Sequence, residues 1–221
     1  MGEDSQNPKP QIHTAPNGPL LYVIDFTMRK VEGLEGDEGQ TYEANRYVAL
    51  CRCGGSESKP LCDGSHGTIR FNERKETDGH LDRRKNYQGE KIVIHDNRGI
   101  CSHSSFCVDQ LPSVFNTDRR PWIDANGATA EEIIATIEKC PSGALSYSIE
   151  GVEHRDLERP PKVIVAKDGP YYIEGGVEMA GHEPRAEEVS VEHCAVCRCG
   201  SSKNKPFCDG AHKDIGFKDP E

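Results

Sequence analysis

The sequence predicts an α+β protein built from three small modules rather than one large domain. Three observations carry this prediction. A sixteen-residue stretch occurs twice, at residues 51–66 and 197–212, with the same residue at 11 of its 16 positions. The segment between the copies reads as a strand, a helix and a strand. Only 34% of the 221 residues are hydrophobic, which is little material for a single large core, and bound metal is another way to stabilise small modules.

The chain starts with a polar segment, and we expect residues 1–16 to form a mobile tail. This segment lacks the apolar centre of an export signal. The first copy follows at residues 17–74, where Asn17–Met28 predicts a turn and a short strand. Asp168–Met179 has a similar pattern, so we place the second copy at residues 162–219.

The middle module, residues 85–150, predicts a different α+β unit. Lys91–His95 is apolar and β-branched, as in a strand, and Ala144–Ile149 alternates between apolar and polar residues. Between them, Thr129–Cys140 has the apolar spacing of a helix. Its first residue can cap the helix, and Glu132 completes a capping box.

Each copy contains a possible metal site with the spacing C-x-C-x8-C-x3-H. Three Cys and one His can hold tetrahedral zinc or an iron–sulfur cluster. Structural zinc sites usually use C-x2-4-C pairs, whereas here one residue separates the first pair, so both thiols point from the same side of an extended segment. Two such pairs suit the two irons of a 2Fe–2S cluster. The residues are Cys51, Cys53, Cys62 and His66 (site 1) and Cys197, Cys199, Cys208 and His212 (site 2).

Both copies resemble the CDGSH iron–sulfur (mitoNEET-like) family, whose pattern is C-x-C-x2-(S/T)-x3-P-x-C-D-G-(S/A/T)-H. Ser56 and Pro60 complete the pattern in the first copy, as do Ser202 and Pro206 in the second. The resemblance implies one 2Fe–2S cluster per copy, with the first two Cys on the inner iron and the third Cys and His on the outer iron. Because such proteins work as homodimers, we expect this chain to be a monomer whose two copies form an internal pseudo-dimer.

Four residues beside the ligands have expected local roles. Asp63 and Asp209 can cap the turn that carries the His. Gly64 and Gly210 can take a positive φ and bring backbone N–H groups to a sulfur. A further cysteine, Cys194, lies three residues before site 2. It aligns with a valine in the first copy, so we expect a buried apolar role rather than a ligand.

The middle module predicts a third cluster. Cys101, Ser104 and Cys107 follow the frame C-x2-S-x2-C, and Cys140 precedes a proline, which resembles a divergent single-cluster ferredoxin domain. Three thiolates favour a 3Fe–4S cluster. A 4Fe–4S cluster would need Ser104, His103 or an outside ligand on the fourth iron. The remaining alternative is three reduced thiols without metal.

Composition excludes several classes of function. The net charge of −10 disfavours nucleic acid, and the sequence lacks the roughly 20-residue apolar run of a membrane span. No catalytic residues stand out, since no dinucleotide fingerprint, phosphate loop or Ser-His-Asp order is present. We therefore expect a non-enzymatic, cytoplasmic electron carrier with proton-coupled redox that meets a redox partner protein. The alternatives are cluster storage and transfer to an apo iron–sulfur protein, or a redox or pH sensor.

Overall fold

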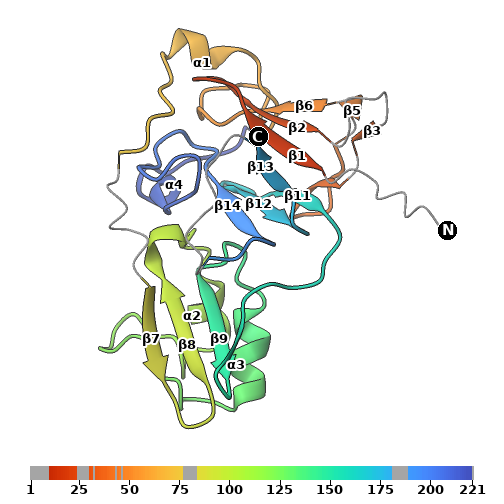
Figure 1. Ribbon diagram of the computed structural model, residues 1–221. Coiled ribbons are helices and arrows are strands. Elements are labelled where there is room, and N and C mark those ends of the chain that lie inside the picture. The colour runs from red at the N-terminus through yellow and green to blue at the C-terminus, as the bar shows by residue number, and fades with distance from the viewer. Residues whose placement is uncertain are drawn as a thin grey trace, which may run out of the picture.

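The computed structural model describes residues 10–23, 30–31, 33–42, 44–45, 47–76, 84–180 and 189–220. Small sheets and short helices make up this part of the chain, as expected for an α+β protein. The sheets of the two copies lie together at one end of the molecule, and the middle module lies at the other end (Figure 1).

The sheet of the first copy contains a strand from the second copy. Its order is β13-β1-β2-β6, with the first copy supplying β1 (Gln11–Thr14), β2 (Leu20–Val23) and β6 (Tyr47–Leu50). The fourth strand, β13 (Glu178–Ala180), pairs in parallel with β1. The expectation of a mobile tail up to residue 16 is therefore wrong for β1, because Ile12 is fully buried there. Residues 1–9 lie outside the described residues.

The sheet of the second copy has the reciprocal arrangement. Its order is β14-β12-β11-β4, with β11 (Lys162–Val165), β12 (Tyr171–Glu174) and β14 (Cys194–Val196) from the second copy. The strand from the first copy, β4 (Leu34–Gly36), pairs in parallel with β11. A separate two-stranded sheet joins β3 (Lys30–Val31) to β5 (Ala44–Asn45).

The exchanged strands enclose one apolar core that both copies share. Ile12, Tyr22 and Leu50 of the first copy pack in the same cluster as Tyr171 and Val196 of the second. Cys194 is also buried in this cluster, which confirms that it packs as a small core side chain. Because both copies contribute side chains to this one cluster, neither copy has a complete core without the other. Burial of a large apolar side chain contributes about 1.5–3 kcal/mol to stability.

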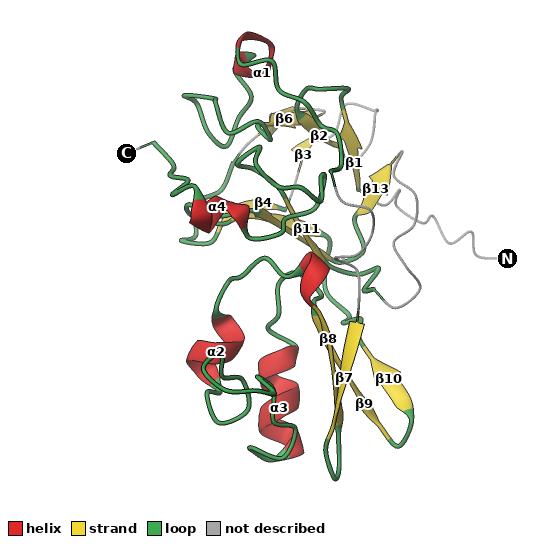
Figure 2. Ribbon diagram, turned by 90° about the vertical axis from the view of Figure 1, so that its left-hand side faces the viewer, coloured by secondary structure: helices red, strands yellow, loops and turns green. Residues whose placement is uncertain are grey.

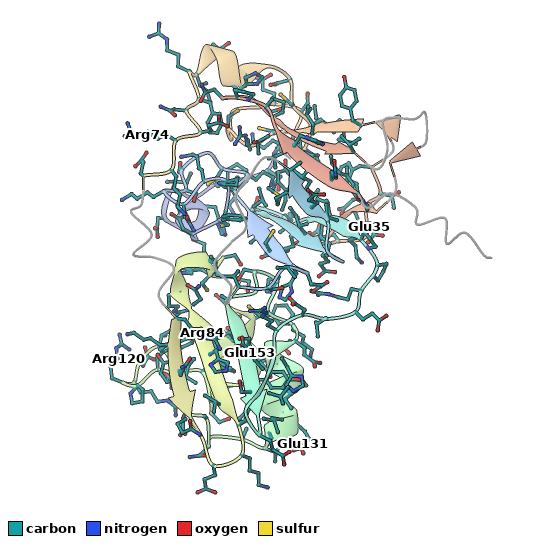
Figure 3. All side chains as sticks on the ribbon, in the orientation of Figure 1. Glu35, Arg74, Arg84, Arg120, Glu131 and Glu153 are labelled. Carbon is teal, nitrogen blue, oxygen red and sulfur yellow. The ribbon has the colours of Figure 1, made fainter. Side chains whose placement is uncertain are left out.

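The middle module is an antiparallel sheet with helices on one face (Figure 2). The strand order is β10-β9-β8-β7, made of β7 (Arg84–Gln88), β8 (Val93–Asn97), β9 (Leu145–Ile149) and β10 (Val152–His154). An ion pair of 2.9 Å between Arg84 and Glu153 joins its two outer strands (Figure 3). The predicted strand at Lys91–His95 is shifted by two residues, because Gly89 and Ile92 close the preceding turn with a backbone hydrogen bond.

Two helices cover the sheet of the middle module, α2 (Phe106–Gln110) and α3 (Ala130–Ile137). Thr129 caps α3, and the predicted capping box with Glu132 is present. Ile133 and Ile137 are buried, which confirms the apolar face. The helix ends before the predicted limit, because the backbone N–H of Cys140 bonds to the carbonyl of Ile137 in a tight turn.

Candidate metal centres

The first two cysteines of each copy form a close pair directly after a strand, β6 in site 1 and β14 in site 2. The sulfurs of Cys51 and Cys53 are 3.7 Å apart, and those of Cys197 and Cys199 are 3.8 Å apart. A tetrahedral metal with two sulfur ligands at about 2.3 Å holds those sulfurs about 3.8 Å apart. Each inner pair is therefore spaced to bind one metal.

The third cysteine and the histidine form the outer pair of each site. Short helices carry the histidines, α1 (Ser65–Thr68) in site 1 and α4 (Ala211–Asp214) in site 2. The sulfur of Cys62 lies 3.4 Å from Nδ1 of His66, and that of Cys208 lies 3.5 Å from Nδ1 of His212. Sulfur and nitrogen ligands on one tetrahedral metal lie about 3.6 Å apart. The outer pairs are thus also spaced for one metal each, with Nδ1 as the nitrogen ligand.

Backbone hydrogen bonds bring the outer pair beside the inner pair. The N–H of Cys62 donates to the carbonyl of Ala49 in β6, and that of Cys51 donates to the carbonyl of Pro60, both at 2.8 Å. Site 2 repeats these bonds. Cys208 donates to Ala195 at 3.0 Å, and Cys197 donates to Pro206 at 2.8 Å. The loop between the pairs therefore folds back onto the strand that leads into it.

In site 1, Asp63 caps the turn before α1 as the sequence predicts, and Gly64 has the predicted positive φ. The carboxylate of Asp63 accepts hydrogen bonds from the backbone N–H of Ser65, at the start of α1, and of Glu57. The hydrogen bonds from Ser65 contribute most to holding the pKa of Asp63 well below its usual range. Gly64 has φ 91°, a conformation that favours glycine.

Asp209 and Gly210 repeat this arrangement in site 2. Asp209 accepts from the backbone N–H groups of Lys203 and Ala211. Gly210 has φ 89°, and its N–H lies 3.4 Å from the sulfur of Cys208. This is the predicted N–H contact to a ligand sulfur.

Burial makes the thiolate form of several cysteines costly in the metal-free chain. It raises the pKa of Cys53 and of Cys208, and it raises the pKa of Cys107 in the middle module to about 11. Within the described residues, no three or more His, Cys, Asp and Glu side chains converge on one point for a single metal ion. The donors of the two copies are arranged as close pairs, and their thiols must release protons when metal binds.

The sequence reasoning missed a buried arginine between the two cysteines of each inner pair. Arg52 is 3% exposed, donates to the carbonyls of Gly18 and Ala15, and pairs with Glu73. Adjacent residues of an extended segment face opposite sides, so this guanidinium points away from the thiols. It ties the turn before β2 to the segment after α1.

Arg198 makes the same set of contacts in the second copy. It is 1% exposed, donates to the carbonyls of Gly169 and Ala166, and pairs with Asp219. The signal for this role was present in the sequence, because C-R-C occurs in both copies and an acidic residue follows each motif at the same offset.

The third candidate site is a cavity of about 250 Å³ in the middle module. The residues that line it include all three predicted ligands, Cys101, Cys107 and Cys140, and also Ser104 and His103. Cys101 accepts a hydrogen bond of 3.4 Å from the guanidinium of Arg98. The structure thus brings to one cavity three cysteines that span 39 positions of the chain, from Cys101 to Cys140.

Comparisons with known proteins found two family models that match regions of this chain. A family model described as "Iron-binding zinc finger CDGSH type" matches residues 17–67 and 168–213, and one described as "Divergent 4Fe-4S mono-cluster" matches residues 87–150. The sites and these matches define an iron–sulfur protein. The chain belongs to the CDGSH family, with two CDGSH regions and a divergent 4Fe-4S mono-cluster domain between them, which confirms the resemblance seen in the sequence.

Two curated relatives share part of the chain. They are the proteins named "Uncharacterized protein YjdI" of Escherichia coli strains K12 and O157:H7, each 43% identical over 61 residues. The match spans 28% of this chain and 80% of each relative. No solved structure matches the chain significantly. No helix within the described ranges has the length and apolar character needed to cross a membrane.

Proposed function

We propose that this protein is a cytoplasmic, non-enzymatic electron carrier that holds two 2Fe–2S clusters and a third cluster in its middle module. The observation that carries the proposal is the pairing of donors. Each copy has an inner pair and an outer pair, both at the spacing of two ligands on one tetrahedral metal. Two metals held side by side by four ligands are the requirement of a 2Fe–2S cluster.

The reciprocal contacts between the copies support an internal pseudo-dimer within one chain. Each copy gives one strand to the sheet of the other, β13 to β1 and β4 to β11. Cys53 and Cys199 form an antiparallel bridge with each other. In a two-fold arrangement, residue i of one half meets residue j of the other, and j meets i, as these pairs do.

The ligand chemistry favours electron transfer. A bound 2Fe–2S cluster supplies one-electron chemistry, and replacing thiolate by neutral imidazole removes negative charge and raises the reduction potential. In this chain, His66 and His212 hold that position. An imidazole ligand can also gain or lose a proton near neutral pH, which couples proton uptake to electron uptake.

For the middle module we propose a 3Fe–4S cluster, because three cysteines line the cavity among the residues that the structure describes. The family description names a 4Fe-4S cluster, which would need a fourth ligand from Ser104, His103 or outside the chain. Both side chains line the cavity, and the ring of His103 also lies against Gly210 of the second copy.

An EPR spectrum of the full-length protein, isolated in air and then reduced with dithionite, tests the proposal together with iron and sulfide analysis. An oxidised 3Fe–4S centre gives a signal before reduction, whereas the 2Fe–2S centres give signals only after it. Electron exchange with a ferredoxin-type partner, without loss of colour, would support the carrier function. A colourless protein with stoichiometric zinc would overturn the cluster assignment.

A second candidate function is cluster delivery to an apo iron–sulfur protein. The specific observation in its favour is that Cys62 and His66 are partly exposed, so a ligand of an acceptor protein can approach the outer pair. Incubation of the holo-protein with an apo-ferredoxin separates the two functions. Transfer of an intact cluster favours delivery, and electron exchange without transfer favours the carrier.

A further inference from the structure

The two CDGSH sites have nearly the same sequence but unequal surroundings. In site 2, Cys208 is 2% exposed and His212 is 7% exposed. In site 1, the equivalent Cys62 and His66 are only partly buried. The ligands and their spacing cannot cause this difference, because both are the same in the two copies. The cause is the middle module, which packs against site 2 (Figure 1).

Close contacts fix the middle module on site 2. A Cβ atom at Gly210 would lie 2.7 Å from Cγ of His103, whereas a Cβ atom at the equivalent Gly64 would meet nothing within 4 Å. The buried amide of Asn204 donates to the carbonyl of Gly99 at 2.9 Å. Lys213 donates to the hydroxyl of Ser105 at 3.0 Å.

The sequence of the first copy lacks the side chains that make these contacts. The positions of Asn204 and Lys213 correspond to Ser58 and Gly67. A serine is shorter than an asparagine, and a glycine has no side chain. The second copy is thus specialised for binding the middle module.

The middle site lies next to the outer pair of site 2. Ser104, which lines the middle cavity, also lines a groove between the two modules together with His212 and Tyr172.

The inner pair of site 2 faces site 1. Cys53 and Cys199 form a β-bridge. A Cβ atom at Gly54 would lie 2.4 Å from the carbonyl oxygen of Cys199, and one at Gly200 would lie 2.4 Å from that of Cys53. The two inner pairs therefore meet at the boundary between the copies, and the outer pair of site 1 lies beyond them.

We infer that the three sites form a linear series, in which site 2 is an enclosed relay between the middle site and site 1. Site 1 is then the place where the chain exchanges electrons with an outside partner. This order rests on the proposed electron-carrier function. The unequal access to the two sites follows from packing alone and holds whichever function the clusters serve.

Cluster loss from the full-length holo-protein tests the unequal access. The protein is incubated with the iron chelator EDTA, and the variants His66→Cys and His212→Cys assign the visible absorption of each site. We expect site 1 to lose its cluster at least about tenfold faster than site 2, because site 2 opens only when the modules separate. Equal rates, or faster loss from site 2, would overturn the inference.

Gly64→Ala and Gly210→Ala provide matched variants. Both glycines have a φ near 90°, so backbone strain is common to the two substitutions. Only Gly210→Ala must displace His103. We expect Gly210→Ala to speed loss from site 2 more than Gly64→Ala speeds loss from site 1. The opposite order would show that the middle module does not protect site 2.

Electron spin relaxation tests the order of the sites. A paramagnetic middle cluster should speed the relaxation of the reduced cluster in site 2 more than that in site 1. An equal or larger effect on site 1 would refute the linear order. These measurements need no partner, so failure of electron exchange with a partner would count against the carrier function alone.

Discussion

Replacing Asp219 by Asn should destabilise the second copy by about 2–3 kcal/mol, because it removes the counter-charge of a buried guanidinium. Arg198 has a fully buried side chain, and Asp219 is 20% exposed. Two guanidinium nitrogens of Arg198 bond to the two carboxylate oxygens. Loss of one partner of a buried pair costs about 3–5 kcal/mol, and the partial exposure and the remaining amide oxygen reduce this.

Glu73→Gln is the matched control in the first copy. Glu73 pairs with Arg52 through one oxygen and is 35% exposed, so solvent screens the pair. We therefore expect a cost of about 1 kcal/mol or less. The equivalent positions of the two acids make the comparison direct.

Urea unfolding of the full-length holo-protein, followed by circular dichroism and by cluster absorption, measures both effects. Burial raises the pKa of Asp219, but hydrogen bonds from Arg198 and Asp168 outweigh it, so the net pKa is lowered. The stabilisation is therefore present above pH 4 or so and is lost as pH falls through the lower folded-state pKa. Equal costs for Asp219→Asn and Glu73→Gln, or a cost of Asp219→Asn that persists at low pH, would refute the reasoning.

Three further predictions concern the middle module and the histidine ligands. Burial raises the pKa of Asp96 to about 6, so this group favours folding at low pH, and its contribution is lost as pH rises from about 4 to 6. Asp96→Asn should therefore reduce the fall of the urea midpoint between about pH 4 and 6, and an unchanged fall would contradict this. Ser104→Cys should supply a fourth thiolate to the middle cluster and so remove the EPR signal of an oxidised 3Fe–4S centre. Persistence of that signal would show that residue 104 does not reach the cluster. His66→Cys and His212→Cys should each lower the reduction potential of one cluster, as measured by redox titration. Each should also slow the loss of that cluster, as measured by visible absorption. A raised potential would argue against the histidine as a ligand.

The local features were predictable because they depend on neighbours in the chain. A spacing of one residue places two thiols on one side of an extended segment, and a spacing of three residues places Cys and His across one turn. The inner pair at Cys51 and Cys53 and the outer pair at Cys62 and His66 have the spacing of two ligands on one metal. The capping box at Thr129 was predictable for the same reason.

Features that depend on distant residues were missed or wrong. The segment Gln11–Thr14 is polar apart from Ile12, and only its pairing with β2 and β13 makes it a strand. The role of Arg198 was also missed, because its carboxylate partner and its carbonyl acceptors come from separate parts of the chain.

The sequence by itself determined how the candidate metal donors are grouped in pairs, because both cysteine–histidine motifs bring their donors together through local geometry. Only the tertiary structure decided that the copies exchange β4 and β13 and that the inner pairs meet at their boundary. It also decided that the middle module encloses His212 and leaves His66 partly exposed. Burial of a ligand is set by side chains such as His103, more than 100 positions away, and a sixteen-residue pattern carries no information about them.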